Sequence, residues 1–161
     1  MLFLTFSQEE DKIFFVLRGE IFMMKKLVNT AFTYTVVALV CGVINREFTK
    51  MVGFTGQTNL SLLHTHLFTL GMLFFLVVLA LEAIFKVSEQ KMFKWFFIIY
   101  NIGLVLSAMM MAVRGFLQVQ GTELSKALHA SISGISGIGH IGLGVGLALF
   151  FIVLKRSVAT K

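Results

Sequence analysis

The sequence contains four long apolar segments that are almost free of charged side chains. A helix needs about 20 apolar residues to cross a bilayer, and each segment can supply them. The expected helices cover approximately residues 27–44, 60–85, 94–117 and 124–155. This pattern predicts an all-α membrane protein, a four-transmembrane-helix bundle.

Composition argues against an ordinary soluble domain. The chain is 57% hydrophobic and only 14% charged, and its mean hydropathy is +0.89. So few charged residues could not cover the surface of a soluble domain of this size. No fixed sequence period recurs, which argues against a repeat fold. Residues 23–161 are therefore expected to form one transmembrane domain. Cys41 is the only cysteine, which excludes an intramolecular disulfide.

The lysines and arginines that flank the apolar segments predict an orientation. If both termini are cytoplasmic, eight basic residues flank the inner ends of the helices and four flank the outer ends. The inner set is Lys25, Lys26, Lys86, Lys91, Lys94, Lys155, Arg156 and Lys161, and the outer set is Arg46, Lys50, Arg114 and Lys126. The positive-inside rule therefore favours N-in/C-in. The net charge of +6 then reflects topology and contact with anionic lipid rather than nucleic acid.

Residues 1–22 do not resemble the segments that follow them. Their apolar runs are short and interrupted by acidic residues, which does not match a cleavable signal peptide. We expect that this stretch is not part of the native protein and that the start codon was assigned too early. The native chain would then begin close to Met23. The alternative is a short amphipathic helix lying on the cytoplasmic surface of the membrane.

Each predicted helix gathers polar and small residues on one face, if successive residues are about 100° apart. His64 shares a face with Gly71 and Glu82, whereas His66 points about 200° away from it. The other three faces are Tyr34 with Thr30, Cys41 and Asn45; Arg114 with Tyr100, Gly103 and Ser107; and His140 with His129, Ser133, Ser136 and Gly144. Such faces are expected to turn inward in a membrane bundle.

Two inward histidines on different helices are suited to bind b-type haem. Neutral imidazoles of His64 and His140 would supply the two axial bonds, with His66 as the alternative ligand. Arg46 and Arg114, near the same side of the membrane, would pair with the haem propionates. The physiological role would be electron transfer, haem handling, or gas or redox sensing, with a redox partner protein or a second copy of the chain as partner.

Two other classes of function stay open. One is a copper or other divalent-metal site formed by His64, His66 and His129. The other is a cofactor-free helper or subunit of a larger membrane complex. A stand-alone hydrolase is not indicated, because no carboxylate–histidine pair forms within a helix and no HExxH motif occurs.

Two resemblances add to these predictions. The stretch LSLLHTHLFTLGM, residues 60–72, resembles the second helix of the catalytic subunits of haem–copper oxidases and nitric-oxide reductases, which implies a low-spin haem ligand there. Residues 24–155 resemble a family of small bacterial membrane proteins, largely from Firmicutes, whose function is unknown. The segments that carry this second resemblance include YNIGLVLSAMMMAVRG and QGTELSKALHASISGISGIGHIGLG. It implies the four-helix fold and a multi-pass protein of the bacterial cytoplasmic membrane. His129 stands where that family is expected to have asparagine, which argues against a ligand role for it.

Overall fold

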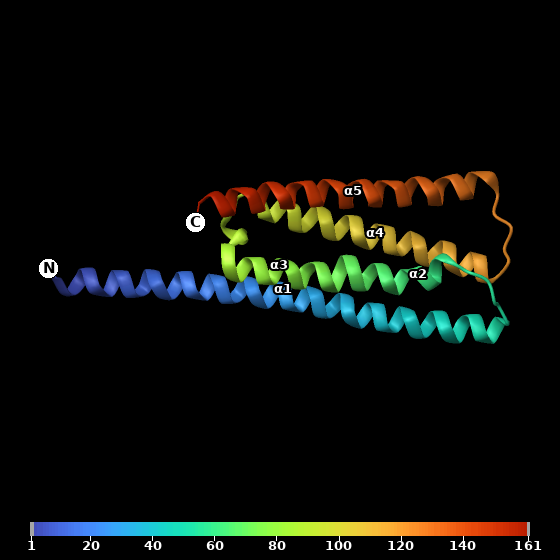
Figure 1. The fold of residues 1–161 in the computed structure, drawn as a ribbon, viewed down its shortest axis with the longest axis horizontal. Helices are drawn as coiled ribbons and strands as arrows, with labels where there is room; N and C mark the ends of the chain where they lie inside the picture. The colour runs from blue at the N-terminus through green and yellow to red at the C-terminus, as the bar shows by residue number, and fades with distance from the viewer. Residues whose placement is uncertain (1, 161) are drawn as a thin grey trace.

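A computed structural model describes the backbone of residues 2–160 and the side chains of residues 18–160. Long helical rods run side by side in alternating directions, and the first rod begins at the same end of the molecule at which the last rod ends (Figure 1). The elements are α1 (Leu2–Val52), α2 (Asn59–His66), η1 (Leu67–Leu73), α3 (Phe74–Phe85), η2 (Val87–Glu89), α4 (Phe93–Val119) and α5 (Lys126–Ala159). Residues 18–160 contain four helices that are long and apolar enough to cross a membrane, and no strand occurs in residues 2–160. The predicted fold class is thereby confirmed.

Some helix boundaries differ from the predicted ones. Helix α1 continues to Val52, eight residues beyond the end predicted from the sequence at residue 44. At its other end it begins at Leu2 and includes residues 2–22 without a break. Gly53 has a φ of +70°, a conformation that glycine adopts without strain, and it ends the helix. Helix α5 begins at Lys126, because the Ser125 side chain accepts a hydrogen bond from the backbone N–H of Leu128.

The rods pack mainly in chain order. Helix α1 lies against the rod formed by α2, η1 and α3, this second rod lies against α4, and α4 lies along α5. On α1 the contact stripe is Leu27, Ala31, Tyr34 and Ala38, all buried at alternating spacings of four and three residues. Side chains on the outer faces are mostly large and apolar, which suits contact with lipid.

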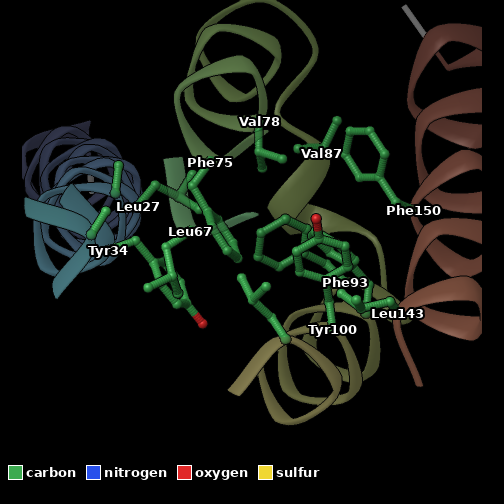
Figure 2. Packing of buried hydrophobic residues seen from close by; sticks show 14 of the residues in the cluster. Leu27, Tyr34, Leu67, Phe75, Val78, Val87, Phe93, Tyr100, Leu143 and Phe150 are labelled. Atoms are coloured by element: carbon green, nitrogen blue, oxygen red, sulfur yellow. The ribbon is translucent and has the colours of Figure 1, made fainter. Parts of the chain in front are cut away.

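Aromatic rings fill the core on the side of the termini. Phe75 of the second rod stacks on Tyr34 of α1 with ring centroids 5.9 Å apart. Phe74 stacks on Tyr100 of α4 at 4.4 Å, and Phe150 of α5 meets Phe96 at 5.0 Å. Figure 2 shows the second rod contributing side chains between those of α1 and those of α4 and α5. This cluster joins all four rods.

Glycines bring α4 and α5 into close contact. A Cβ added at Gly103 would lie 2.6 Å from the backbone nitrogen of Leu143, and one at Gly139 would lie 2.8 Å from that of Ser107. Close approach through small residues is the usual way in which membrane helices associate. Gly134, Gly137 and Gly144 lie elsewhere on α5, since an added Cβ would meet no heavy atom within 4 Å. The glycine-dense part of α5 therefore has one packed face and one open face.

The second rod contains a π-helical segment, η1, where the sequence predicted a regular helix. Its buried residues show the change of period: Leu60, Leu63, Leu67, Gly71, Phe75, Val78 and Glu82. Three successive steps of four residues replace the alternation of three and four that α1 shows. The Leu70 carbonyl accepts a hydrogen bond of 2.9 Å from the Tyr100 hydroxyl. Gly71 faces the ring of Tyr34, where an added Cβ would come within 2.5 Å of Cγ. Tyr100 of α4 and Tyr34 of α1 thus both contact the π-helical segment.

The short connection between α3 and α4 is organised by a buried carboxylate. Glu82 is 2% exposed, and it accepts hydrogen bonds from the backbone N–H and the hydroxyl of Ser88, at 2.8 and 2.6 Å. Lys86, which has a left-handed backbone conformation, pairs with Glu20 of α1. That hydrogen bond to Glu20 raises the pKa of the Lys86 ammonium. Glu82 therefore stabilises the loop between α3 and α4. It lies at the opposite end of its rod from His64.

Candidate functional site

A groove of about 480 Å³ lies between α1 and α4, and Leu63 of α2 and Leu67 of η1 also line it. It exists because α1 and α4 both pack on the second rod but scarcely touch each other. Its lining residues are Thr30, Thr33, Tyr34, Val37, Cys41, Leu63, Leu67, Asn101, Val105, Ala108, Met109 and Ala112. Val37, Val105 and Met109 are exposed at its rim, so the groove opens sideways, toward the lipid in a membrane.

One polar pair lies within the apolar walls of the groove. The Tyr34 hydroxyl of α1 donates a hydrogen bond of 2.7 Å to Oδ1 of Asn101 on α4. Asn101 is held in place by its own Nδ2, which donates to the Phe97 carbonyl at 2.7 Å. Tyr34 is fixed by its stacking on Phe75. The pair therefore presents polar atoms at a defined position in the groove.

The groove has a polar end and an apolar end. At the polar end, the Thr30 hydroxyl donates to the Lys26 carbonyl and the Thr33 hydroxyl donates to the Asn29 carbonyl. Lys26 also places its ammonium 4.1 Å from the centre of the Phe97 ring, which links α1 to α4 beside the groove. At the other end, Cys41 is a free, half-buried thiol.

His64 lies on the side of the second rod that faces α1. Its ring carbon Cγ would be 3.8 Å from a Cβ added at Gly42, and its ring meets Phe68 edge-on at 6.5 Å. Its Nδ1 atom is buried and has no hydrogen-bond partner among residues 18–160. The same is true of Oδ1 of Asn45, one helical turn beyond Gly42 on α1. Unpaired polar atoms in such places are costly, and they often mark a bound water or ligand.

The other histidines have different surroundings. Nδ1 of His66 lies 3.2 Å from the Leu62 carbonyl, and Nδ1 of His140 lies 2.8 Å from the Ser136 carbonyl. If Nδ1 donates in both rings, Nε2 keeps its lone pair. His140 and His129 are exposed on α5, whereas His66 is half-buried.

The structure does not bring the predicted haem ligands together. His64 faces α1, whereas His140 is exposed on α5, a helix that packs chiefly on α4. Arg114 donates to the Ser133 hydroxyl of α5 at 2.6 Å, and Arg46 lies 3.7 Å from Glu47 in an exposed ion pair. Residues 18–160 contain no group of three His, Cys, Asp or Glu that could hold a metal ion, so His64, His66 and His129 form no such group.

The sequence predicted part of the groove lining, although it did not predict a groove. Thr30, Tyr34 and Cys41 were expected to share one face of α1, and all three line the groove. Asn101 was missed, although an amide inside an otherwise apolar span is itself a signal of a polar contact. The gap between α1 and α4 could not be predicted, because it depends on how two helices lie on a third.

Comparisons with known proteins give one family. The model of the family described as "Protein of unknown function (DUF2871)" matches residues 24–157. No curated protein and no solved structure matches the chain, so the likeness of residues 60–72 to the haem-ligand helix of the oxidases gains no support. Since the family model covers most of the sequence, the chain belongs to the DUF2871 family.

Proposed function

We propose that this protein binds a lipophilic small molecule, taken up from the bilayer, in the groove between α1 and α4. The observation that carries the proposal is the Tyr34–Asn101 hydrogen bond, set between apolar walls in a groove of about 480 Å³. An apolar pocket with a few convergent polar groups is the usual form of a small-molecule site. Polar groups inside membrane spans are costly and tend to be kept for function.

The shape of the groove favours entry from the membrane rather than from water. Its rim residues Val37, Val105 and Met109 are 42%, 46% and 55% exposed, and all three are apolar. A lipophilic ligand would cover these side chains and the gap between the two helices. A polar ligand would lose its hydration without enough partners to replace it.

Filling the groove tests this proposal. Ala108 lines the groove, so Ala108→Trp should occupy the space that the ligand needs. Ala80 is an exposed residue of α3 outside the groove, so Ala80→Trp is the matched control. The wild-type protein and Ala80→Trp should each release the same lipophile on solvent extraction, in constant ratio to protein, and Ala108→Trp should release little. Equal amounts from all three proteins would refute the proposal.

Binding of b-type haem by His64 and His140 is the second candidate function. Two observations favour it: Nδ1 of His64 is buried without a partner in the part of the chain whose side chains are described, and the Ser136 carbonyl lies within hydrogen-bond distance of Nδ1 of His140. A backbone acceptor on one ring nitrogen is the common arrangement of a metal-binding histidine, because it leaves the other nitrogen free. Since His64 and His140 lie on different faces, this candidate pairs His64 of one copy with His140 of another.

A redox spectrum of the detergent-purified protein tests the haem candidate. Bis-histidine ligation predicts a six-coordinate low-spin haem that His64→Ala and His140→Ala each disrupt. His129→Ala is the control, because His129 lies exposed in the first turns of α5. Protein that is colourless and does not bind added haemin would rule this candidate out.

A further inference from the structure

We infer that the ligand of the α1–α4 groove carries an uncharged hydroxyl group of the hydroquinone type, held at Tyr34 and Asn101, with an apolar tail that extends toward Cys41. This inference rests on the proposed function and specifies its ligand. Three features of the groove support it: the absence of charged residues in its lining, the hydrogen-bonding capacity left at the polar pair, and the distribution of polar groups along its length.

The first feature is the lack of charge. None of the lining residues is Asp, Glu, Lys, Arg or His. A phosphate or carboxylate head placed at Tyr34 would therefore lose its hydration without a counter-charge, which is very unfavourable in an apolar setting. The nearby ammonium of Lys26 is turned to the Phe97 ring. The head group that binds beside Tyr34 must therefore be neutral.

The second feature is the hydrogen-bonding capacity that remains. The hydroxyl protons of Thr30, Thr33 and Tyr34 already go to acceptors of the protein. The oxygens of Tyr34 and Asn101 each keep a lone pair, and Asn101 has one more N–H beyond the one given to Phe97. The pair thus offers both acceptors and a donor. A hydroxyl group can satisfy both, whereas a quinone carbonyl can only accept.

The third feature is the shape of the groove. Thr30 and Cys41 lie at its two ends along α1, a separation of roughly 16 Å at the rise of an α-helix. The polar lining residues of α1 lie between Thr30 and Tyr34, whereas the lining beyond Tyr34 is apolar apart from the Cys41 thiol. The polar part extends roughly 6 Å along α1, from Thr30 to Tyr34, which suits a compact ring with a hydroxyl, and the remainder suits a single apolar tail.

Direct binding measurements test the inference on the full chain in detergent. Equilibrium dialysis would compare decyl-hydroquinone, decyl-quinone and the dimethyl ether of the hydroquinone. The hydroquinone should bind about fivefold more tightly than either of the others, the effect of one additional hydrogen bond. If no probe binds, both this inference and the proposed function are overturned. If all three bind equally, the groove remains a lipophile site and only the hydroxyl assignment is overturned.

Variants locate the effect at the polar pair. Asn101→Leu should bind the three probes with nearly equal affinity, and Tyr34→Phe should reduce the preference for the hydroquinone. Tyr100→Phe is the matched control, because Tyr100 is also a buried tyrosine but its hydroxyl bonds the Leu70 carbonyl outside the groove. A preference that survives both Asn101→Leu and Tyr34→Phe contradicts the inference. A monoacylglycerol that displaces the hydroquinone at lower concentrations would identify a glycerol hydroxyl instead, and would overturn the hydroquinone assignment.

Discussion

The contact between α4 and α5 makes a quantitative prediction about glycine. In Gly103→Ala, the new methyl group would lie 2.6 Å from the backbone nitrogen of Leu143 and 2.8 Å from the carbonyl carbon of Gly142. Ordinary contact distances are about 3.5–4.0 Å, so the helices must separate by roughly 1 Å. Because the obstructing atoms belong to the backbone, no change of side-chain rotamer can relieve the overlap.

Gly103→Ala should lower the free energy of unfolding by about 2 kcal/mol. Overpacking a tight contact usually costs about 1–3 kcal/mol, and the backbone atoms that obstruct the new methyl group place this one near the upper end of that range. Alanine regains roughly 0.5–1 kcal/mol relative to glycine within a helix. Gly137→Ala is the control, because an added Cβ there meets no heavy atom within 4 Å. The free energy of unfolding of Gly137→Ala should therefore change only by the gain from the higher helix propensity of alanine.

Thermal unfolding in detergent, followed through the fluorescence of the single tryptophan, Trp95, measures the difference. Gly103→Ala should unfold at a lower temperature than the wild type, and Gly137→Ala at the same or a slightly higher temperature. Equal midpoints for the two variants would refute the close packing of α4 on α5.

The remaining predictions concern the π-helical segment, the inner loop and the topology. Tyr100→Phe should lower the free energy of unfolding by about 1–3 kcal/mol, because it leaves a buried carbonyl of η1 without its donor; an unchanged unfolding midpoint would show that the hydroxyl is dispensable. Ser88→Ala should destabilise the loop by a similar amount, since Glu82 would lose one of its two hydrogen bonds from Ser88; protection of this loop from hydrogen exchange should fall. In a chain without the native cysteine, cysteines at Thr55 and at Gln120 should react with an impermeant thiol reagent in intact cells, whereas one at Glu89 should not. The reverse pattern would contradict N-in/C-in.

The four spans could be predicted because their cause is local. A run of apolar residues as long as that between Asn59 and Phe85 must form its own backbone hydrogen bonds in lipid, and a helix does so. The expectation that small residues of α5 turn inward holds for Gly139, but the face for which it was made, with His140 and Gly144, is exposed. Which glycines pack could not be foreseen: Gly139 meets α4, whereas Gly137 faces away from it.

The candidate site was harder to predict because it depends on three helices at once. Periodicity placed Tyr34 and Cys41 on one face of α1, but only the structure shows that Asn101 of α4 lies opposite them. The face assigned to His64 assumed a uniform period, and the π-helical turns of η1 change that period between His64 and Glu82. Haem ligation by His64 and His140 stays a prediction that only a spectrum of the protein can test.

The most direct test of the account is photocrosslinking inside the living cell at the rim of the groove. A photoreactive amino acid would replace Met109, which lines the groove, and in a matched strain Leu76, an exposed residue of α3 outside it. After irradiation, mass spectrometry of the purified protein should find one predominant small-molecule adduct at position 109 and only a mixture of bulk membrane lipids at position 76. The same lipid mixture at both positions would contradict the claim that the groove is a ligand-binding site.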